Sequence, residues 1–183
     1  LGSLVVKTSK ENQLFLEYIR YLNTKKKESD ILRAQLDKNK DPIGRNGIKA
    51  QMEDMDKAVK TYQKELIANN QGTLAASLVK MSMAVELPEL RKPDGSLDSA
   101  GTYYQFRAHY WDNFDFSDER IVRVPVFANK FDEYIGKTVP QIPDTINKLA
   151  DDLIARTGGQ GEVFKYLVNT ITHKYETSDI MGM

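Results

Sequence analysis

A four-three repeat of apolar residues between positions 48 and 66 constrains the fold more than any other feature of the sequence. The repeat consists of Ile48, Met52, Met55, Val59, Tyr62 and Leu66. This spacing places all six side chains on one stripe of an α-helix and is typical of the seam between two packed helices. Charged residues such as Lys49 and Glu53 lie between them. The segment therefore predicts a long helix that requires a partner helix.

The residues upstream supply a matching apolar face. It comprises Leu14, Phe15, Tyr18, Ile19 and Leu22, and it resumes at Leu32 and Leu36 after a polar stretch. Thr8 and Glu11 have the spacing of a capping box, which predicts a helix start. Residues 41–47 contain proline and two glycines, which favour a turn. We expect one long helix ending near Lys40, or two shorter ones, followed by a turn and an antiparallel partner.

Residues 73–183 have a different character, with shorter apolar repeats and more aromatic residues. Thr73 can cap a third helix that ends near Pro88. Residues 88–101 are rich in proline, glycine, serine and aspartate, so we expect a loop or boundary there. The remainder, 102–183, should form an aromatic-rich bundle whose first helix is mostly buried. Asp115 or Ser117 should cap the short helix that follows.

The predicted fold class is therefore all-α: a long antiparallel helical hairpin followed by a compact multi-helix bundle. The hairpin and third helix occupy residues 8–87, the boundary 88–101 and the bundle 102–183. Residues 1–7 include a strand-like run, Leu4-Val5-Val6, and the chain stops on apolar residues. Both ends indicate a fragment of a longer polypeptide. No apolar stretch is long enough to span a membrane.

Composition excludes several classes of function. Twenty-six basic side chains balance 26 acidic ones, so no net charge favours nucleic acid as a partner. The chain has no cysteine, which removes disulfides, thiolate nucleophiles and zinc–thiolate sites from these residues. Its two histidines, His109 and His173, are in no metal-binding motif. We expect no cofactor, no metal and no catalytic residue in this segment.

Two further motifs are better explained by structure than by chemistry. The acidic residues of 112–119 lack the spacing and the central glycine of a calcium-binding EF-hand loop. Residues 158–161, Gly-Gly-Gln-Gly, are not followed by the lysine and hydroxyl residue of a phosphate-binding loop. We interpret the first as capping and surface charge and the second as a helix stop. A hydrolase that uses the acidic residues near 112–119 is one functional hypothesis. It is less favoured than the two non-catalytic hypotheses given below.

The most informative segment is Trp111-Asp112-Asn113-Phe114-Asp115-Phe116. Alternating aromatic and acidic residues suit a tight helix end, with the rings turned inward and the polar groups free for the backbone or solvent. We interpret it as a structural corner, with a partner or ligand surface as the alternative. These six residues are the candidate site.

Four stretches of the sequence together resemble a known family. They are residues 9–15 (SKENQLF), 62–66 (YQKEL), 109–118 (HYWDNFDFSD) and 174–183 (KYETSDIMGM). They resemble bacterial cell-envelope proteins in which a helical domain of unknown function precedes a thioredoxin-like domain of the thiol peroxidase and thiol–disulfide interchange type. The resemblance covers most of the chain, and its most specific part is the segment containing Trp111.

The resemblance implies a non-catalytic module, because the redox chemistry of that family resides in a downstream Cys-x-x-Cys motif and this chain has no cysteine. It also implies a β-rich domain upstream, with residues 1–7 as its tail, and an exported, lipid-anchored precursor in the cell envelope or periplasm. The module would position the downstream thioredoxin-like domain or recruit its substrate proteins. The alternative is a freestanding interaction module that dimerises through the 48–66 seam.

Overall fold

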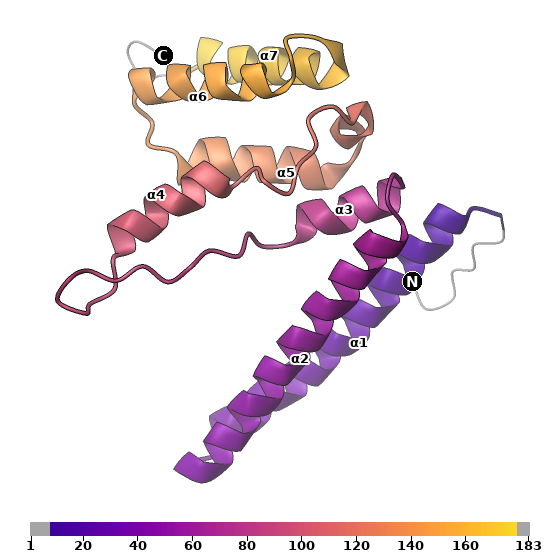
Figure 1. Cartoon of the computed structure of the whole chain (residues 1–183), viewed down its shortest axis with the longest axis vertical. Coiled ribbons are helices and arrows are strands. Elements are labelled where there is room, and N and C mark those ends of the chain that lie inside the picture. Colours follow the sequence, from indigo (N-terminus) through magenta and orange to yellow (C-terminus); the bar gives the residue numbers. More distant parts are fainter. Residues whose placement is uncertain (1–7, 179–183) are drawn as a thin grey trace. The chain divides into compact units, whose positions relative to one another are not determined.

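The structure, a computed structural model, describes residues 8–178, which form seven α-helices and no strand (Figure 1). The helices are α1 (Lys10–Lys38), α2 (Pro42–Asn69), α3 (Leu74–Ser82), α4 (Ser99–His109), α5 (Pro125–Glu133), α6 (Pro143–Arg156) and α7 (Gly161–Glu176). A 3-10 helix, η1 (Glu119–Arg123), precedes α5, and a π-helix, η2 (Tyr134–Thr138), follows it. The all-α prediction is confirmed. The strand-like residues 1–7 lie outside the described part of the chain.

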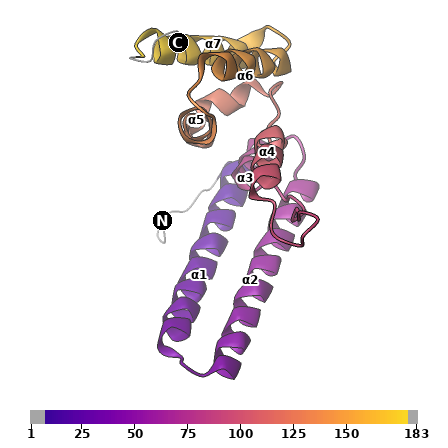
Figure 2. The ribbon, with the colours of Figure 1, turned by 90° about the vertical axis from the view of Figure 1, so that its left-hand side faces the viewer.

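Helices α1 and α2 form the predicted antiparallel hairpin and lie side by side in both ribbon views (Figures 1 and 2). Polar and aromatic contacts set their register. Gln63 donates to the Tyr18 hydroxyl at 2.8 Å, and the Tyr21 and Tyr62 ring centroids are 4.1 Å apart. Near the turn, the Arg45 guanidinium donates to the Asn39 carbonyl at 3.0 Å. The polar stretch in α1 does not interrupt the helix, so the alternative of two shorter helices is wrong.

The helix caps differ in detail from those predicted. Ser9, not Thr8, caps α1 by accepting from the Asn12 amide at 3.2 Å. Asp41 caps α2, and Pro42 already lies in the first turn of that helix, because a proline there forfeits no intrahelical hydrogen bond. The predicted turn over 41–47 is therefore confined to the residues just before Pro42. Thr73 accepts from the Ala76 amide at 3.2 Å, as predicted.

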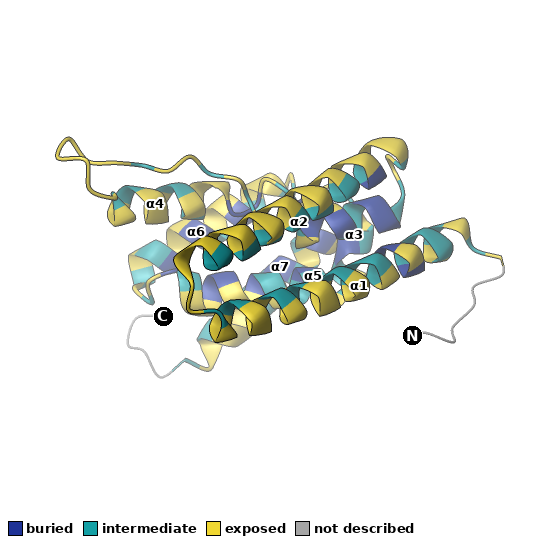
Figure 3. Cartoon of the chain, turned by 90° about the horizontal axis from the view of Figure 1, so that it is seen from below, coloured by how far each residue is buried: buried dark blue, intermediate teal, exposed yellow. Residues whose placement is uncertain are grey.

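The hairpin seam is packed unevenly along its length. Near α3 it contains a core of Tyr18, Leu66 and Val79, each at most 5% exposed. Toward the turn between α1 and α2, seam residues such as Ile48 and Met52 are only half-buried (Figure 3). Two packed helices leave the edges of their seam open to solvent. Helix α3 covers the seam at one end, where Val79 packs against Tyr18 and Leu66. The well-packed part of the hairpin is therefore the end next to α3.

The bundle that follows has an aromatic core. The side chains of Phe127, Phe131 and Ile135 are fully enclosed, and Leu153 of α6 and Leu167 of α7 are at most 1% exposed. Helices α6 and α7 contact each other, and α7 also contacts η1. Helix α5 leads directly into the π-helix η2. Within residues 8–178, no helix has the length and apolar character needed to cross a membrane.

The chain forms two compact units that separate inside α3. The division lies between Val79 and Lys80, and the boundary at 88–101 stays a prediction. Helix α3 also ends at Ser82, well before Pro88. Beyond it, residues 83–90 are extended, with the Met83 carbonyl accepting from the Asn113 side-chain amide at 3.2 Å. Because these extended residues pack within the second unit, the proline- and glycine-rich segment is a surface loop of that unit.

Candidate functional site

The candidate segment 111–116 forms a buried corner after α4. Trp111 is 2% exposed, and its indole lies 4.9 Å from the Phe114 ring, 5.7 Å from Phe116 and 5.2 Å from Tyr134, in edge-to-face arrangements. Such pairs stabilise a core beyond the area they bury. The structure thus brings the three aromatic residues of the segment together, facing inward. Each of the three rings is at most 9% exposed, so they offer little surface to a partner.

The polar members of the segment make local contacts. Asp112 lies 2.7 Å from the His109 ring, and Asn113 holds the extended segment at Met83. Asp115 accepts from the Ser117 amide and hydroxyl at 2.9 and 2.6 Å. The cap of η1 is Asp118, which accepts from the Arg120 amide, so the prediction of Asp115 or Ser117 was wrong. Asp115 instead forms a turn that positions Asp118.

Two tyrosines beside the corner have perturbed acidity. Burial, reinforced by the negative charge of Glu133, raises the pKa of the Tyr110 hydroxyl well above its ordinary value. This hydroxyl donates to the Lys130 carbonyl at 3.0 Å. Burial also raises the pKa of Tyr134, although the positive charge of Arg107 acts in the opposite direction. Both hydroxyls therefore remain protonated hydrogen-bond donors at neutral pH.

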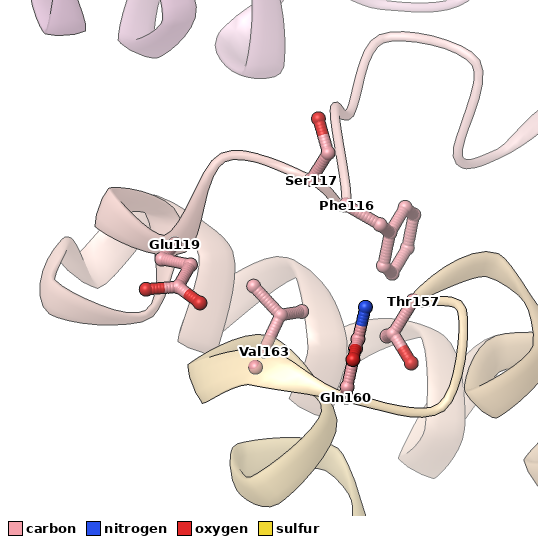
Figure 4. Close-up of a pocket in the computed structure, with 7 residues that line it drawn as sticks. Phe116, Ser117, Glu119, Thr157, Gln160 and Val163 are labelled. Carbon is pink, nitrogen blue, oxygen red and sulfur yellow. The ribbon is translucent and has the colours of Figure 1, made fainter.

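A polar recess of about 350 Å³ adjoins the end of the corner (Figure 4). The Phe116 ring, Thr157 and Gln160 lie close together in it, and Glu119 lies beyond Val163. Gly161 begins α7 here with φ +89°, and a Cβ on it would lie 2.8 Å from the Glu119 carboxylate. The positive φ favours glycine at this position, whereas the flexible Glu119 side chain could move away from a Cβ.

The recess does not support the hydrolase hypothesis. Acid–base hydrolysis by carboxylates needs two of them facing one substrate, and Glu119 is the only carboxylate among the residues that line this recess. Asp118 is paired with Arg120 at 2.8 Å, and Asp112 with His109. Among residues 8–178, no three acidic, histidine or cysteine side chains gather as metal ligands.

A second hollow, which we call the α4 groove, is predominantly apolar. It has a volume of about 520 Å³ and is lined by Leu87, Pro88, Glu89, Leu97, Ser99, Thr102, Tyr103 and Phe106. Leu97 is 57% exposed, and Tyr103 and Phe106 are each 37% exposed. The prediction that the first bundle helix is mostly buried is therefore wrong, because α4 contains no buried residue. Its aromatic residues form a surface, and the buried rings come from the corner that follows.

Sequence reasoning missed the α4 groove for an identifiable reason. Tyr103 and Phe106 are three residues apart and share one face of α4, a spacing that is equally typical of a face packed into a core. The spacing alone therefore does not show that this face lines an open groove. Leu97 comes from the turn between Arg91 and Leu97, which pair in a single antiparallel bridge. The loop composition at 88–101 predicted the turn but not its packing beside α4.

The fold and surfaces define an all-α domain with an aromatic corner and an exposed apolar groove, without a recognisable catalytic constellation in the described residues. A family model described as "Domain of unknown function (DUF5106)" matches residues 62–183, well over half of the chain. The chain belongs to this family. No curated protein and no solved structure gave a significant match. The match begins within α2 and includes α3, the groove and the whole bundle.

Proposed function

We propose that this chain is a non-catalytic accessory module of a cell-envelope thioredoxin-like thiol–disulfide oxidoreductase, and that it recruits substrate polypeptides for the catalytic domain. The absence of cysteine places any thiol chemistry outside these 183 residues. The resemblance of residues 109–118 and 174–183 to envelope proteins of this type supports the cellular setting. Positioning of the thioredoxin-like domain is the other role such a module can perform.

The α4 groove is the observation that carries the proposal. Exposed apolar surface in a soluble domain commonly marks an interaction site. Leu97, Tyr103 and Phe106 surround this groove, and Glu89 is its one charged lining residue, paired with Arg91. An unfolded polypeptide exposes the apolar side chains that such a groove would cover. A bound substrate would then be held at a high effective concentration near the catalytic domain.

The experiment uses the natural full-length polypeptide, whose downstream sequence should encode a thioredoxin-like domain with a Cys-x-x-Cys motif. Reductase kinetics are measured with an unfolded disulfide-containing protein and with a small-molecule disulfide. We expect Leu97→Asp to raise KM for the protein substrate about fivefold or more, because a charge opposes apolar contact. The kinetics with the small disulfide should not change.

Ile142→Asp is the matched control, because Ile142 is apolar and 54% exposed but does not line the α4 groove. It should leave both reactions unchanged. Equal effects of the two variants, or a loss of activity with both substrates in Leu97→Asp alone, would exclude substrate recruitment by the groove. A downstream sequence without a thioredoxin-like domain would exclude the oxidoreductase assignment itself.

A second candidate function is favoured by the hairpin. Seam residues such as Ile48 and Met52 are only half-buried, and Ile31 and Ile43 are 59% and 82% exposed. A second hairpin could cover this surface to form a four-helix bundle. In that case the chain is an interaction module that dimerises through α1 and α2.

A further inference from the structure

A charged recess lies between α4, η2 and α6 in the bundle. It has a volume of about 420 Å³, within the range of roughly 300–1,000 Å³ that is usual for small-molecule sites. Arg107 comes from α4, Tyr134 from η2, and Asp144, Lys148 and Asp152 from α6. We call it the α6 recess. It shares no lining residue with the α4 groove or with the recess beside Glu119.

The four charged residues of the α6 recess have no charged partners of their own. Within residues 8–178, neither Arg107 nor Lys148 forms an ion pair, and neither do the two carboxylates. Asp144, Lys148 and Asp152 follow one another at four-residue steps, so they lie along one face of α6 with alternating sign. The recess therefore presents positive and negative groups side by side along one face of α6.

Arg107 has a second unusual property. Its Nε is buried and has no hydrogen-bond partner, whereas buried polar atoms in proteins are almost always paired. Its guanidinium carbon lies 5.7 Å from the centre of the Tyr103 ring, and the carbonyl of the same residue accepts from the Tyr134 hydroxyl at 3.0 Å. The Tyr103 ring and the Tyr134 hydroxyl beside Arg107 carry no negative charge, so they leave its positive charge uncompensated.

The backbone at the recess is also uncommon. Tyr134 begins the π-helix η2, in which the Val139 amide donates to the Tyr134 carbonyl five residues back, at 3.0 Å. Gln141 donates to the carbonyls of Ile135 and Val139 at 2.7 and 2.9 Å, which stabilises this turn. π-Helical turns are rare and are found frequently at functional sites. This observation is independent of the charges and points to the same recess.

We propose that the α6 recess binds a short zwitterionic peptide through its two charged termini. The carboxylate would lie between Arg107 and Lys148, and the ammonium would lie at Asp144 or Asp152. Residues four apart on a helix are separated by about 6 Å along its axis. The charged ends of an extended dipeptide are about 7 Å apart. A dipeptide therefore matches the spacing of Lys148 and a neighbouring carboxylate better than a free amino acid does.

The test is calorimetric or NMR titration of the whole chain with glycylglycine. We expect saturable binding that weakens at least tenfold for N-acetyl-glycylglycine, which lacks the ammonium, and for glycylglycine amide, which lacks the carboxylate. Glycine, with its charges closer together, should also bind more weakly. Acetate that binds as tightly as glycylglycine would overturn the proposal in favour of a simple anion site.

The variant Lys148→Gln removes the positive charge that α6 contributes to the recess, and the double variant Asp144→Asn/Asp152→Asn removes both negative charges, all at exposed positions. Each should weaken glycylglycine binding at least fivefold while leaving the helical circular dichroism unchanged. Asp151→Asn and Lys137→Gln are the matched controls, because both residues are exposed and neither lines the recess. Absence of saturable binding in the unmodified chain, or equal weakening by the control variants, would refute the proposal.

Discussion

Trp111 shows how one side chain can organise a helix end. Its ring contacts four other aromatic side chains within 6 Å: Tyr110, Phe114, Phe116 and Tyr134. Removing it would leave a cavity among rings that cannot all move to fill it. We expect Trp111→Ala to lower the free energy of unfolding by about 3–5 kcal/mol in urea denaturation.

Tyr104→Ala is the control for this measurement, because Tyr104 is 65% exposed on α4. It should change stability by less than about 0.5 kcal/mol. A Trp111→Ala protein that keeps its stability but loses binding to a partner would instead show that the corner is a recognition surface.

Tyr110 links stability to alkaline pH. Burial, followed by the charge of Glu133, raises the pKa of its hydroxyl in the folded state above the ordinary value of 10.0. The unfolded chain therefore releases this proton at lower pH than the folded chain. The free energy of unfolding should not depend on this group below pH 10.0 and should fall as pH rises above it.

Denaturation at a series of pH values, with tyrosinate absorbance as the second signal, measures this effect. In Tyr110→Phe the free energy of unfolding should fall less steeply with pH above 10.0. The remaining dependence should come from Tyr134 and Tyr62, whose pKa values are also raised by burial. Ionisation of all tyrosines near pH 10 in a protein that remains folded would contradict the expectation.

At the residue scale, the inward rings and the local polar contacts of 111–116 could be predicted because they depend on neighbours in sequence. The partners of Asn113 and Arg107 could not. Asn113 reaches Met83, 30 residues earlier, and Arg107 lies beside α6 only because the bundle folds that way. Neither contact can be predicted from the spacing of residues along the chain.

At the scale of single helices, α2 offers a test of backbone conformation. Gly47 lies inside this helix, and a Cβ on it would meet nothing within 4 Å. Gly72, which follows the helix, has φ +80°. We expect Gly47→Ala to stabilise the protein by about 0.5–1 kcal/mol, because alanine restricts the unfolded chain and suits a helix interior.

Gly72→Ala makes the same chemical change and should destabilise by about 1 kcal/mol, since residues with a Cβ disfavour positive φ. Thermal unfolding of the two variants side by side measures the difference. Stabilisation by both substitutions would show that the α2 end does not require a left-handed residue.

Periodicity predicted the long helices well because α1 and α2 each keep one apolar face over many turns. It predicted the short elements less well. Residues 119–138 contain a 3-10 helix, an α-helix and a π-helix in succession. Such changes of helix type depend on individual side-chain hydrogen bonds, such as those from Gln141 to the Ile135 and Val139 carbonyls, that leave no periodic pattern. The end of α3 at Ser82 has the same origin, since the residues after it pack as an extended segment.

For the whole molecule, the state of association separates the two functional candidates. The hairpin seam of α2 is already paired with α1, so we expect light scattering to give the mass of a single chain at micromolar concentration. Ile31→Glu should then leave the mass unchanged. A dimer that dissociates on this substitution would instead favour the interaction module that pairs through α1 and α2.

The all-α class and the hairpin could be predicted for the whole molecule because they follow from repeats within the sequence. The division at Val79 could not. Residues 88–101 have the composition of a linker, but their turn lines the α4 groove, whereas a regular helix spans the actual division. The composition of a segment indicates whether it is exposed to solvent. It does not indicate which other segments it contacts, and those contacts determine where two compact units divide.

The side chain of Glu11 connects the first turn of α1 to the start of α3. Its carboxylate accepts from the Leu74 amide at 3.3 Å, across 63 positions of sequence. The amide of Leu74 can therefore exchange its hydrogen with solvent only when this contact opens. The slow exchange of a proton at the start of α3 would therefore report on the first turn of α1, and fraying of that turn would speed the exchange.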